Sequence, residues 1–212
     1  MKTEELIAML ARGEDVAAPA RTATVPIVLV AGLLASIALM QAMLRTLPQL
    51  GDAIAWPAFW LKVGFALAMS AAAWHAASAL ARPGAPTAAL PWWLAAPLLV
   101  LWLAAAVMLA QAAPDQRAAL FWGSTWRACP VLIAMLSAPL LAASLWTMRQ
   151  MAPTRLRLAG AAAGLAAGAA GALVYCLHCP EMSPAFVGTW YVLGMLVPTA
   201  IGTLLGPRVL AW

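Results

Sequence analysis

Charged side chains are scarce in this chain of 212 residues, and their scarcity decides its class. Aspartate, glutamate, lysine and arginine together make up 9% of the residues, whereas hydrophobic residues make up 65%. Nearly uncharged runs of about 20 residues, the length that crosses a bilayer as a helix, recur along the chain. This composition leaves almost no room for a water-facing domain and predicts an all-α polytopic membrane protein.

The apolar stretches predict a bundle of six transmembrane helices. Their expected bounds are 25–47, 57–81, 90–112, 128–148, 157–178 and 184–205. A transmembrane barrel is a poor alternative, because its strands alternate apolar and polar residues. The run from Leu98 to Leu109, by contrast, is apolar on every face.

Acidic residues are missing from the middle of every predicted span. An ion-coupled transporter or a proton pump needs ionisable groups at that depth, facing a cavity. Their absence argues against ion-coupled transport and makes a small metal transporter a weak candidate.

The sequence also lacks a recognisable signal peptide, a second domain and an internal repeat. Glu4 and Glu5 follow Lys2 directly, and the apolar run after them is too short for the core of a signal peptide. The connections between spans are short and rich in proline and glycine, as in residues 82–86. We therefore divide the chain into an N-terminal segment, residues 1–24, and a transmembrane domain, residues 25–212.

Positive charges predict the orientation in the membrane, because short cytoplasmic loops are enriched in lysine and arginine. With the N-terminus inside, eight cations are cytoplasmic: Lys2, Arg12, Arg21, Arg82, Arg149, Arg155, Arg157 and Arg208. The other four lie at the outer side: Arg45, Lys62, Arg117 and Arg127. We therefore expect both termini in the cytoplasm, and the net charge of +5 needs no direct nucleic-acid partner.

Two basic residues lie within the predicted spans. We expect Lys62 to extend along its apolar stem to the outer surface, and His75 to reach the inner surface in the same way. A role in lining a pathway is the less favoured interpretation for both.

A short amphipathic helix is predicted near the N-terminus. Thr3 caps it, Glu4 and Glu5 lie in its first turn, and Gly13 ends it. Its apolar stripe consists of Leu6, Ile7, Met9 and Leu10. A helix of about ten residues is marginal by itself in water, and this one is too acidic to suit an anionic membrane surface. We interpret the stripe as a docking face for a partner protein, with a frayed terminus as the alternative.

The fifth span carries a stripe of small residues. Gly160, Gly164 and Gly168 follow one another at four-residue spacing among many alanines. Such a stripe lets a second helix approach closely, so we assign these glycines to helix packing. Gly202 and Gly206 repeat the pattern more weakly in the sixth span.

The reactive side chains gather where the fourth span begins and the fifth ends. Cys129 opens the fourth span, and Cys176, His178, Cys179 and Glu181 follow the fifth. Each leg between a cysteine and the intervening turn has about 23 residues, or roughly 35 Å of helix. The thiols should therefore lie at nearly the same height, and a contact between Cys129 and one of the other two is plausible.

Three interpretations of this cluster stay open. Two apposed cysteines form a disulfide in an oxidising compartment. Alternatively, Cys129 and Cys179, with Cys176, His178 or Glu181, hold a thiophilic metal ion. In the third interpretation they are ordinary buried cysteines and His178 is an interfacial side chain. No cofactor is required by any other feature of the sequence.

Several motifs together resemble a known family. They are the six spans after a short N-terminal segment, Phe59-Trp60-Leu61-Lys62, Cys129-Pro130, His178-Cys179-Pro180-Glu181, Ser183-Pro184-x-Phe186, Trp190-Tyr191 and the ending Gly206-Pro207-Arg208. Over essentially the whole chain this pattern is similar to the NrsF family of bacterial membrane anti-sigma factors. The most specific part is the motif around Cys179.

The resemblance implies a non-enzymatic protein of the bacterial inner membrane. Such a protein holds an extracytoplasmic-function sigma factor inactive at the cytoplasmic face and releases it under oxidative or heavy-metal stress. The family's paired sensing cysteines correspond to Cys129 and Cys179, and Cys176 is an additional candidate. The alternative is a membrane thiol-disulfide oxidoreductase that uses Cys176 and Cys179 as an active pair.

Overall fold

The computed structural model describes residues 3–5, 7, 24–82, 84–151 and 153–211, which contain helices and no strands. The elements are α2 (Thr24–Met43), α3 (Leu50–Ile54), α4 (Pro57–Leu80), α5 (Leu90–Gln111), α6 (Pro114–Trp122), α7 (Cys129–Arg149), α8 (Leu156–Tyr175), α9 (Pro184–Phe186) and α10 (Val192–Val209). A π-helical turn, η2 (Val187–Tyr191), joins α9 to α10. The predicted all-α class is confirmed.

Six helices among the described residues are long and apolar enough to cross a membrane. They are α2, α4, α5, α7, α8 and the continuous helix Pro184–Val209, which combines α9, η2 and α10. Their bounds lie within a few residues of the predicted spans. The short helices α3 and α6 were not predicted, because they lie in connections that hydropathy does not resolve.

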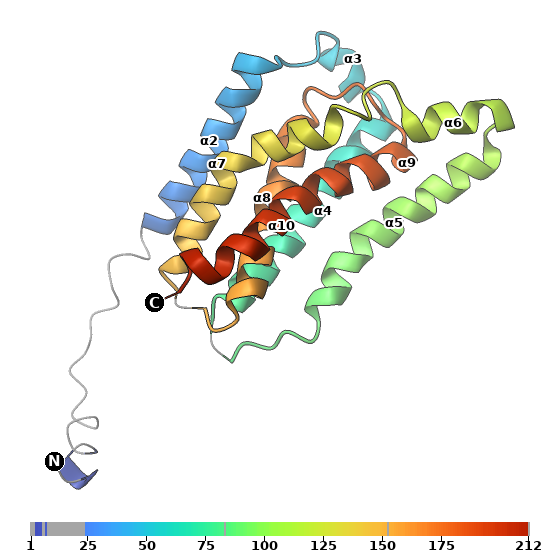
Figure 1. The fold of residues 1–212 in the computed structure, drawn as a ribbon. Coiled ribbons are helices and arrows are strands. Elements are labelled where there is room, and N and C mark those ends of the chain that lie inside the picture. The colour runs from blue at the N-terminus through green and yellow to red at the C-terminus, as the bar shows by residue number, and fades with distance from the viewer. Residues whose placement is uncertain (1–2, 6, 8–23, 83, 152, 212) are drawn as a thin grey trace.

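Helix α8 forms the centre of the bundle and contacts α10, α7 and α4. In its most apolar window 72% of the residues are buried within the protein, against 11% for α5. Figure 1 shows the same difference, with α8 enclosed by its neighbours and α5 along the edge of the bundle. The alanine and glycine content of α8 allows this close enclosure.

The glycine stripe of α8 faces α10 across a very close contact. A Cβ atom on Gly160 would collide with the carbonyl oxygen of Gly202, and one on Gly164 with the carbonyl oxygen of Pro198. One on Gly168 would meet the ring of Pro198 at 2.8 Å. The two backbones therefore touch directly, without side chains between them.

The two ends of the bundle differ in charge. One end, which we call the thiol end, carries the three cysteines and charges of both signs, namely Asp52, Asp115, Glu181, Arg45, Arg117 and Arg127. The other, which we call the basic end, carries the exposed residues Arg82, Arg149, Arg155, Arg157 and Arg208. The C-terminal end of α10 also lies there (Figure 1). Placing the basic end in the cytoplasm stays a prediction from the positive-inside rule.

The predicted docking helix lies mostly outside the described residues. Residues 3–5 and Ile7 are helical, and the side chain of Ile7 is 59% exposed. Leu6, Met9 and Leu10 lie outside the described residues, so the assignment of this stripe stays a prediction.

Candidate functional site

The candidate site forms where α7 begins and α8 ends. Cys129 is the first residue of α7, and the proline after it suits the first turn of a helix. Helix α8 ends at Tyr175, and Cys176 forms its C-cap. A turn follows in which the N–H of Cys179 donates to the carbonyl of Tyr175, before Pro180 prevents further helix. We call residues 176–183 the thiol loop.

The structure brings Cys129 and Cys179 together. Helices α7 and α8 are neighbours, and the thiols of these two residues are hydrogen-bonding partners. Both side chains are completely buried, and that of Cys176 is 1% exposed. All three cysteines are free thiols. The predicted contact is therefore present, it involves Cys179 rather than Cys176, and it is not a disulfide.

The surroundings of the two loop cysteines shift their acidities in opposite directions. The hydrogen bond from Cys129, together with the positive charge of Lys62, lowers the pKa of Cys179 from 9.0 to about 6. Burial raises the pKa of Cys176 to about 12. Because the thiolate is the reactive form, Cys179 is the more nucleophilic thiol of the loop at neutral pH.

Two buried tyrosines lie beside the thiols. The rings of Tyr175 and Tyr191 lie 5.7 Å apart, centroid to centroid, and both residues are buried. Tyr191 ends the π-helical turn η2, whose wider winding changes the direction of its side chain relative to an α-helix. Its buried hydroxyl has no nitrogen or oxygen partner and lies beside the cysteine sulfurs.

Lys62 occupies a different place from the one predicted. Its side chain is 1% exposed, and its Nζ donates to the carbonyl oxygens of Cys179 at 2.8 Å and Glu181 at 3.2 Å. The prediction that it reaches the outer surface is wrong, because the thiol loop covers the end of α4. Lys62 is therefore part of the site.

The other polar residues of the loop bind neighbouring connections instead of the thiols. His178 Nδ1 lies 2.8 Å from the carbonyl oxygen of Arg45, after α2. The Glu181 carboxylate accepts hydrogen bonds from the backbone N–H and the hydroxyl of Ser124, each 2.7 Å long. The N–H of Leu47 donates to Leu177 at 3.0 Å. The thiol loop is thus fastened to connections on both sides of it.

These contacts bear on the predicted metal ligands Cys129, Cys179, His178 and Glu181. Among the described residues, no group of three or more His, Cys, Asp or Glu side chains could hold a metal ion. The imidazole and the carboxylate are engaged with Arg45 and Ser124, as described above. The two thiols in contact remain as donors for a soft cation.

Comparison with known proteins extends over the whole site and the whole chain. A family model described as "Negative regulator of sigma F" matches residues 10–212. The chain belongs to the NrsF family. A "Probable anti-sigma-F factor NrsF" of Azospira oryzae is 49% identical over 213 residues, covering 100% of both chains. An "Anti-sigma-F factor NrsF" of Caulobacter vibrioides is 39% identical over 220 residues, again covering 100% of both. No solved structure matches.

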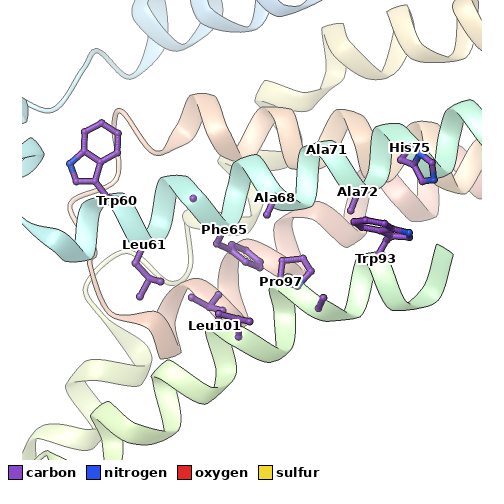
Figure 2. A pocket seen from close by; sticks show the side chains of 13 residues that line it. Trp60, Leu61, Phe65, Ala68, Ala71, Ala72, His75, Trp93, Pro97 and Leu101 are labelled. Atoms are coloured by element: carbon purple, nitrogen blue, oxygen red, sulfur yellow. The ribbon is translucent and has the colours of Figure 1, made fainter. Parts of the chain in front are cut away.

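A large cavity elsewhere in this NrsF-family chain bears on the oxidoreductase alternative. It measures about 780 Å³ and lies between α4 and α5, where His75 and Trp93 stand at one end and Trp60 at the other (Figure 2). Almost all of its lining is apolar, and none of the three cysteines contributes to it. A bound electron acceptor there would not touch the thiols, so the cavity does not support thiol oxidation by a quinone.

Sequence reasoning included Lys62 and Tyr191 in the family motifs but did not place them at the thiols, and it did not single out Ser124. Lys62 is one of only two lysines in the chain and lies inside a predicted span. A lysine in that position indicates a functional role if its side chain is buried in the protein. Ser124 follows Gly123, whose φ of +58° marks a turn that glycine favours. For Tyr191 the signal was its place in the Trp190-Tyr191 motif, but aromatic residues are common near span ends, so the motif did not indicate contact with the thiols.

Proposed function

We propose that this chain is a multi-pass anti-sigma factor of the bacterial inner membrane. It holds an extracytoplasmic-function sigma factor inactive at the cytoplasmic face and releases it when the outer thiols react with an oxidant or a thiophilic metal ion. Full-length similarity to proteins named as anti-sigma-F factors supports the first part. The buried contact between Cys129 and Cys179 carries the second part. The protein acts by binding and not by catalysis.

The proposed sensing step is a reaction between two thiols already in contact. With hydrogen peroxide, the two thiols lose two protons and two electrons and one S–S bond forms, while the O–O bond breaks and the peroxide is reduced to two molecules of water. Sulfurs in a disulfide are only about 2.0 Å apart, closer than two hydrogen-bonded thiols. Oxidation therefore pulls the start of α7 towards the thiol loop. A soft cation bound between two thiolates imposes its own spacing on the same two segments.

A shift at the thiol end can reach the basic end through rigid helices. Cys129 is the first residue of α7, and α7 packs along α8, which in turn is in backbone contact with α10 through the glycine stripe. Tightly packed helices move as bodies rather than deform locally. A displacement of α7 relative to α8 is therefore carried to the basic end, where the five arginines lie in the last turns of α7 and α10, the first turn of α8 and the adjoining connections.

At the cytoplasmic face the sigma factor is held by the N-terminal helix and the basic connections. The docking stripe is Leu6, Ile7, Met9 and Leu10. The exposed side chain of Ile7 supports this part of the proposal. Allosteric release requires that the sensing reaction favour one of two states of the helix bundle, with the sigma factor preferring the other.

Capture of the sigma factor from membranes tests the proposal. The intact protein, purified in mild detergent from reduced membranes, should bring down a sigma factor, and treatment with peroxide or cadmium ions should release it. Cys129→Ser and Cys179→Ser variants should bring down the same sigma factor and retain it during treatment. Failure to capture a sigma factor would refute the anti-sigma activity. Release of the sigma factor from both variants to the same extent as from the parent protein would refute the thiol sensor.

Deletion of residues 1–13 tests the docking helix separately. The truncated protein should insert in the membrane and lose the sigma factor without any stimulus, so that transcription from sigma-dependent promoters becomes constitutive. Retention of the sigma factor by the truncated protein would contradict the assignment of the stripe. A Leu6→Asp, Leu10→Asp double variant tests the apolar face without shortening the chain.

A further inference from the structure

Lys62 places a positive charge inside the protein at the thiol site. Its ammonium group lies between α4 and the thiol loop, donates to the carbonyl oxygens of Cys179 and Glu181, and lies 5.5 Å from the centroid of the Phe59 ring. The side chain is 1% exposed. Such a group is unusual in a membrane span and usually has a function.

The charge of Lys62 is compensated mainly by the thiol loop. Removing an ammonium group from water costs several kcal/mol unless hydrogen bonds and opposite charges replace the solvent. No carboxylate among the described residues is bonded to Lys62, and the carboxylate of Glu181 binds Ser124 instead. The two loop carbonyls are its hydrogen-bond acceptors. Displacing the loop from α4 would therefore leave a buried cation without its acceptors.

Both carbonyls belong to the turn that carries Cys179, and this couples the position of the thiol to α4. We propose that Lys62 is a positioning residue of the thiol site. Its ammonium holds the turn Cys179–Glu181 against α4 so that Cys179 faces Cys129, and reaction of the thiol pair releases this hold. The inference rests on the sensing function proposed above. It adds α4 to α7 and α8 as a third helix that responds to the reaction of the thiols.

Helix α4 is well placed to use such a release. It runs from the thiol end to the basic end, where its C-cap is followed directly by Arg82, and it packs along α8. When the thiol loop moves towards Cys129, the hydrogen bonds from Lys62 to the carbonyls of Cys179 and Glu181 break. The thiol end of α4 is then no longer held to the loop, so α4 is free to move relative to α8.

Replacement of Lys62 by methionine tests the positioning role on the purified protein. Methionine has a similar length and is apolar, so Lys62→Met removes the charge and both hydrogen bonds while filling most of the space. We expect peroxide to form the Cys129–Cys179 disulfide at least tenfold more slowly in this variant. Lys62→Arg, which keeps a charge and several donors, should recover most of the rate. Disulfide formation is followed by mass spectrometry of the linked peptides.

Arg117 offers a matched control. It is an exposed cation at the same end, and its Nε donates to a backbone carbonyl, that of Ala112, at 3.2 Å. Arg117→Met should leave the rate of disulfide formation unchanged. If Lys62→Met inserts in the membrane and forms the disulfide at the rate of the parent protein, the positioning role is disproved.

A second measurement uses the unmodified sequence and does not depend on the folding of a variant. The chain has two lysines, Lys2 and Lys62, so acylation of each by an amine-reactive ester is easily assigned by mass spectrometry. Lys62 should react slowly in the reduced protein and at least fivefold faster once the disulfide has formed, while Lys2 serves as the reference. An unchanged rate at Lys62 on disulfide formation would disprove its release.

These experiments separate the inference from the proposed function, because neither involves a sigma factor. If Lys62→Met forms the disulfide slowly but releases the sigma factor normally once the disulfide has formed, the thiol sensor is upheld and the contact of α4 with the loop is not needed for signalling. If the disulfide forms and the acylation of Lys62 speeds up as expected, but sigma binding does not change, the sensing function is refuted and the positioning role stands.

Discussion

The thiol of Cys129 is the hydrogen-bonding partner of the thiol of Cys179, across the junction between the start of α7 and the loop that follows α8. The two residues are 50 positions apart in the chain, and both are completely buried. Cys176 lies only three residues before Cys179, yet it forms the cap of α8 and its thiol is held as the neutral acid by burial, which raises its pKa to about 12.

This arrangement predicts which disulfide forms. Mild peroxide treatment of the purified protein should link Cys129 to Cys179, because these thiols are already in contact and Cys179 is the better nucleophile. Cys176→Ala should give the same product at a similar rate, whereas Cys179→Ala should give none. Peptide mapping by mass spectrometry identifies the linked residues. A product that joins Cys176 to either of the other two would contradict the geometry.

The acidity of Cys179 predicts how its reactivity depends on pH. Because its pKa is lowered to about 6, the thiolate predominates above that pH and the rate of modification should be level there. Below pH 6 the rate should fall about tenfold per unit, since the reactive thiolate is protonated. An ordinary thiol with a pKa of about 8.5 would still gain rate between pH 6 and 8.

This profile is measured by modifying Cys179 with a small, neutral, thiol-reactive compound at pH values between 4.5 and 9. Mass spectrometry then gives the extent of modification at each pH. Cys129→Ala removes the largest cause of the shift and should move the midpoint upward. A profile with the same midpoint in parent and variant would show that Cys129 does not set the acidity of Cys179.

The backbone contact between α8 and α10 predicts a large difference between two glycines. Gly164→Ala would drive a Cβ into the carbonyl oxygen of Pro198, so we expect a loss of roughly 1–3 kcal/mol in the free energy of unfolding. Gly64, within α4, has open space around the position of a Cβ. Gly64→Ala should therefore be neutral or stabilise by about 0.5–1 kcal/mol, through the better helix propensity of alanine. Unfolding in mixed detergent micelles compares the two.

Gly123 predicts a coupling between the α6–α7 connection and the thiol loop. Its φ of +58° disfavours any side chain, and a Cβ there would lie 2.8 Å from the Glu181 carboxyl and 2.7 Å from the Phe186 ring. Gly123→Ala should therefore displace Glu181 from Ser124 and speed hydrogen exchange in residues 123–128 and 176–183.

Gly84 is the control for the backbone effect alone, because its φ is +76° but no atom lies near its Cβ position. Gly84→Ala should cost about 1–2 kcal/mol of local strain and leave exchange at the thiol end unchanged. Equal exchange at the thiol end in the two variants would show that the contact with Glu181 does not hold the loop.

Part of the site could be predicted from the sequence, because the heights of the cysteines follow from the number of residues in each helix and the rise per residue. Equal leg lengths before and after the turn near residue 152 predicted that Cys129 would meet a cysteine at the end of α8, and it does. The choice between Cys176 and Cys179 was beyond such counting. It depends on where α8 ends and on the direction of the single turn that follows, which the proline after Cys179 and the packing of Tyr175 and Tyr191 decide together.

The sequence by itself determined the class, the six spans and the family, because the hydrocarbon thickness of a bilayer imposes a length and a composition on each span that are visible without any tertiary contact. Only the tertiary structure decided where the polar side chains lie and which groups they bind. Lys62 was expected at the outer surface, and instead it is buried under the thiol loop and bonded to two of its carbonyls. The side chain of a lysine is long enough to end in water or in the protein, so what covers the end of its helix decides the outcome, and that cover comes from residues more than a hundred positions away.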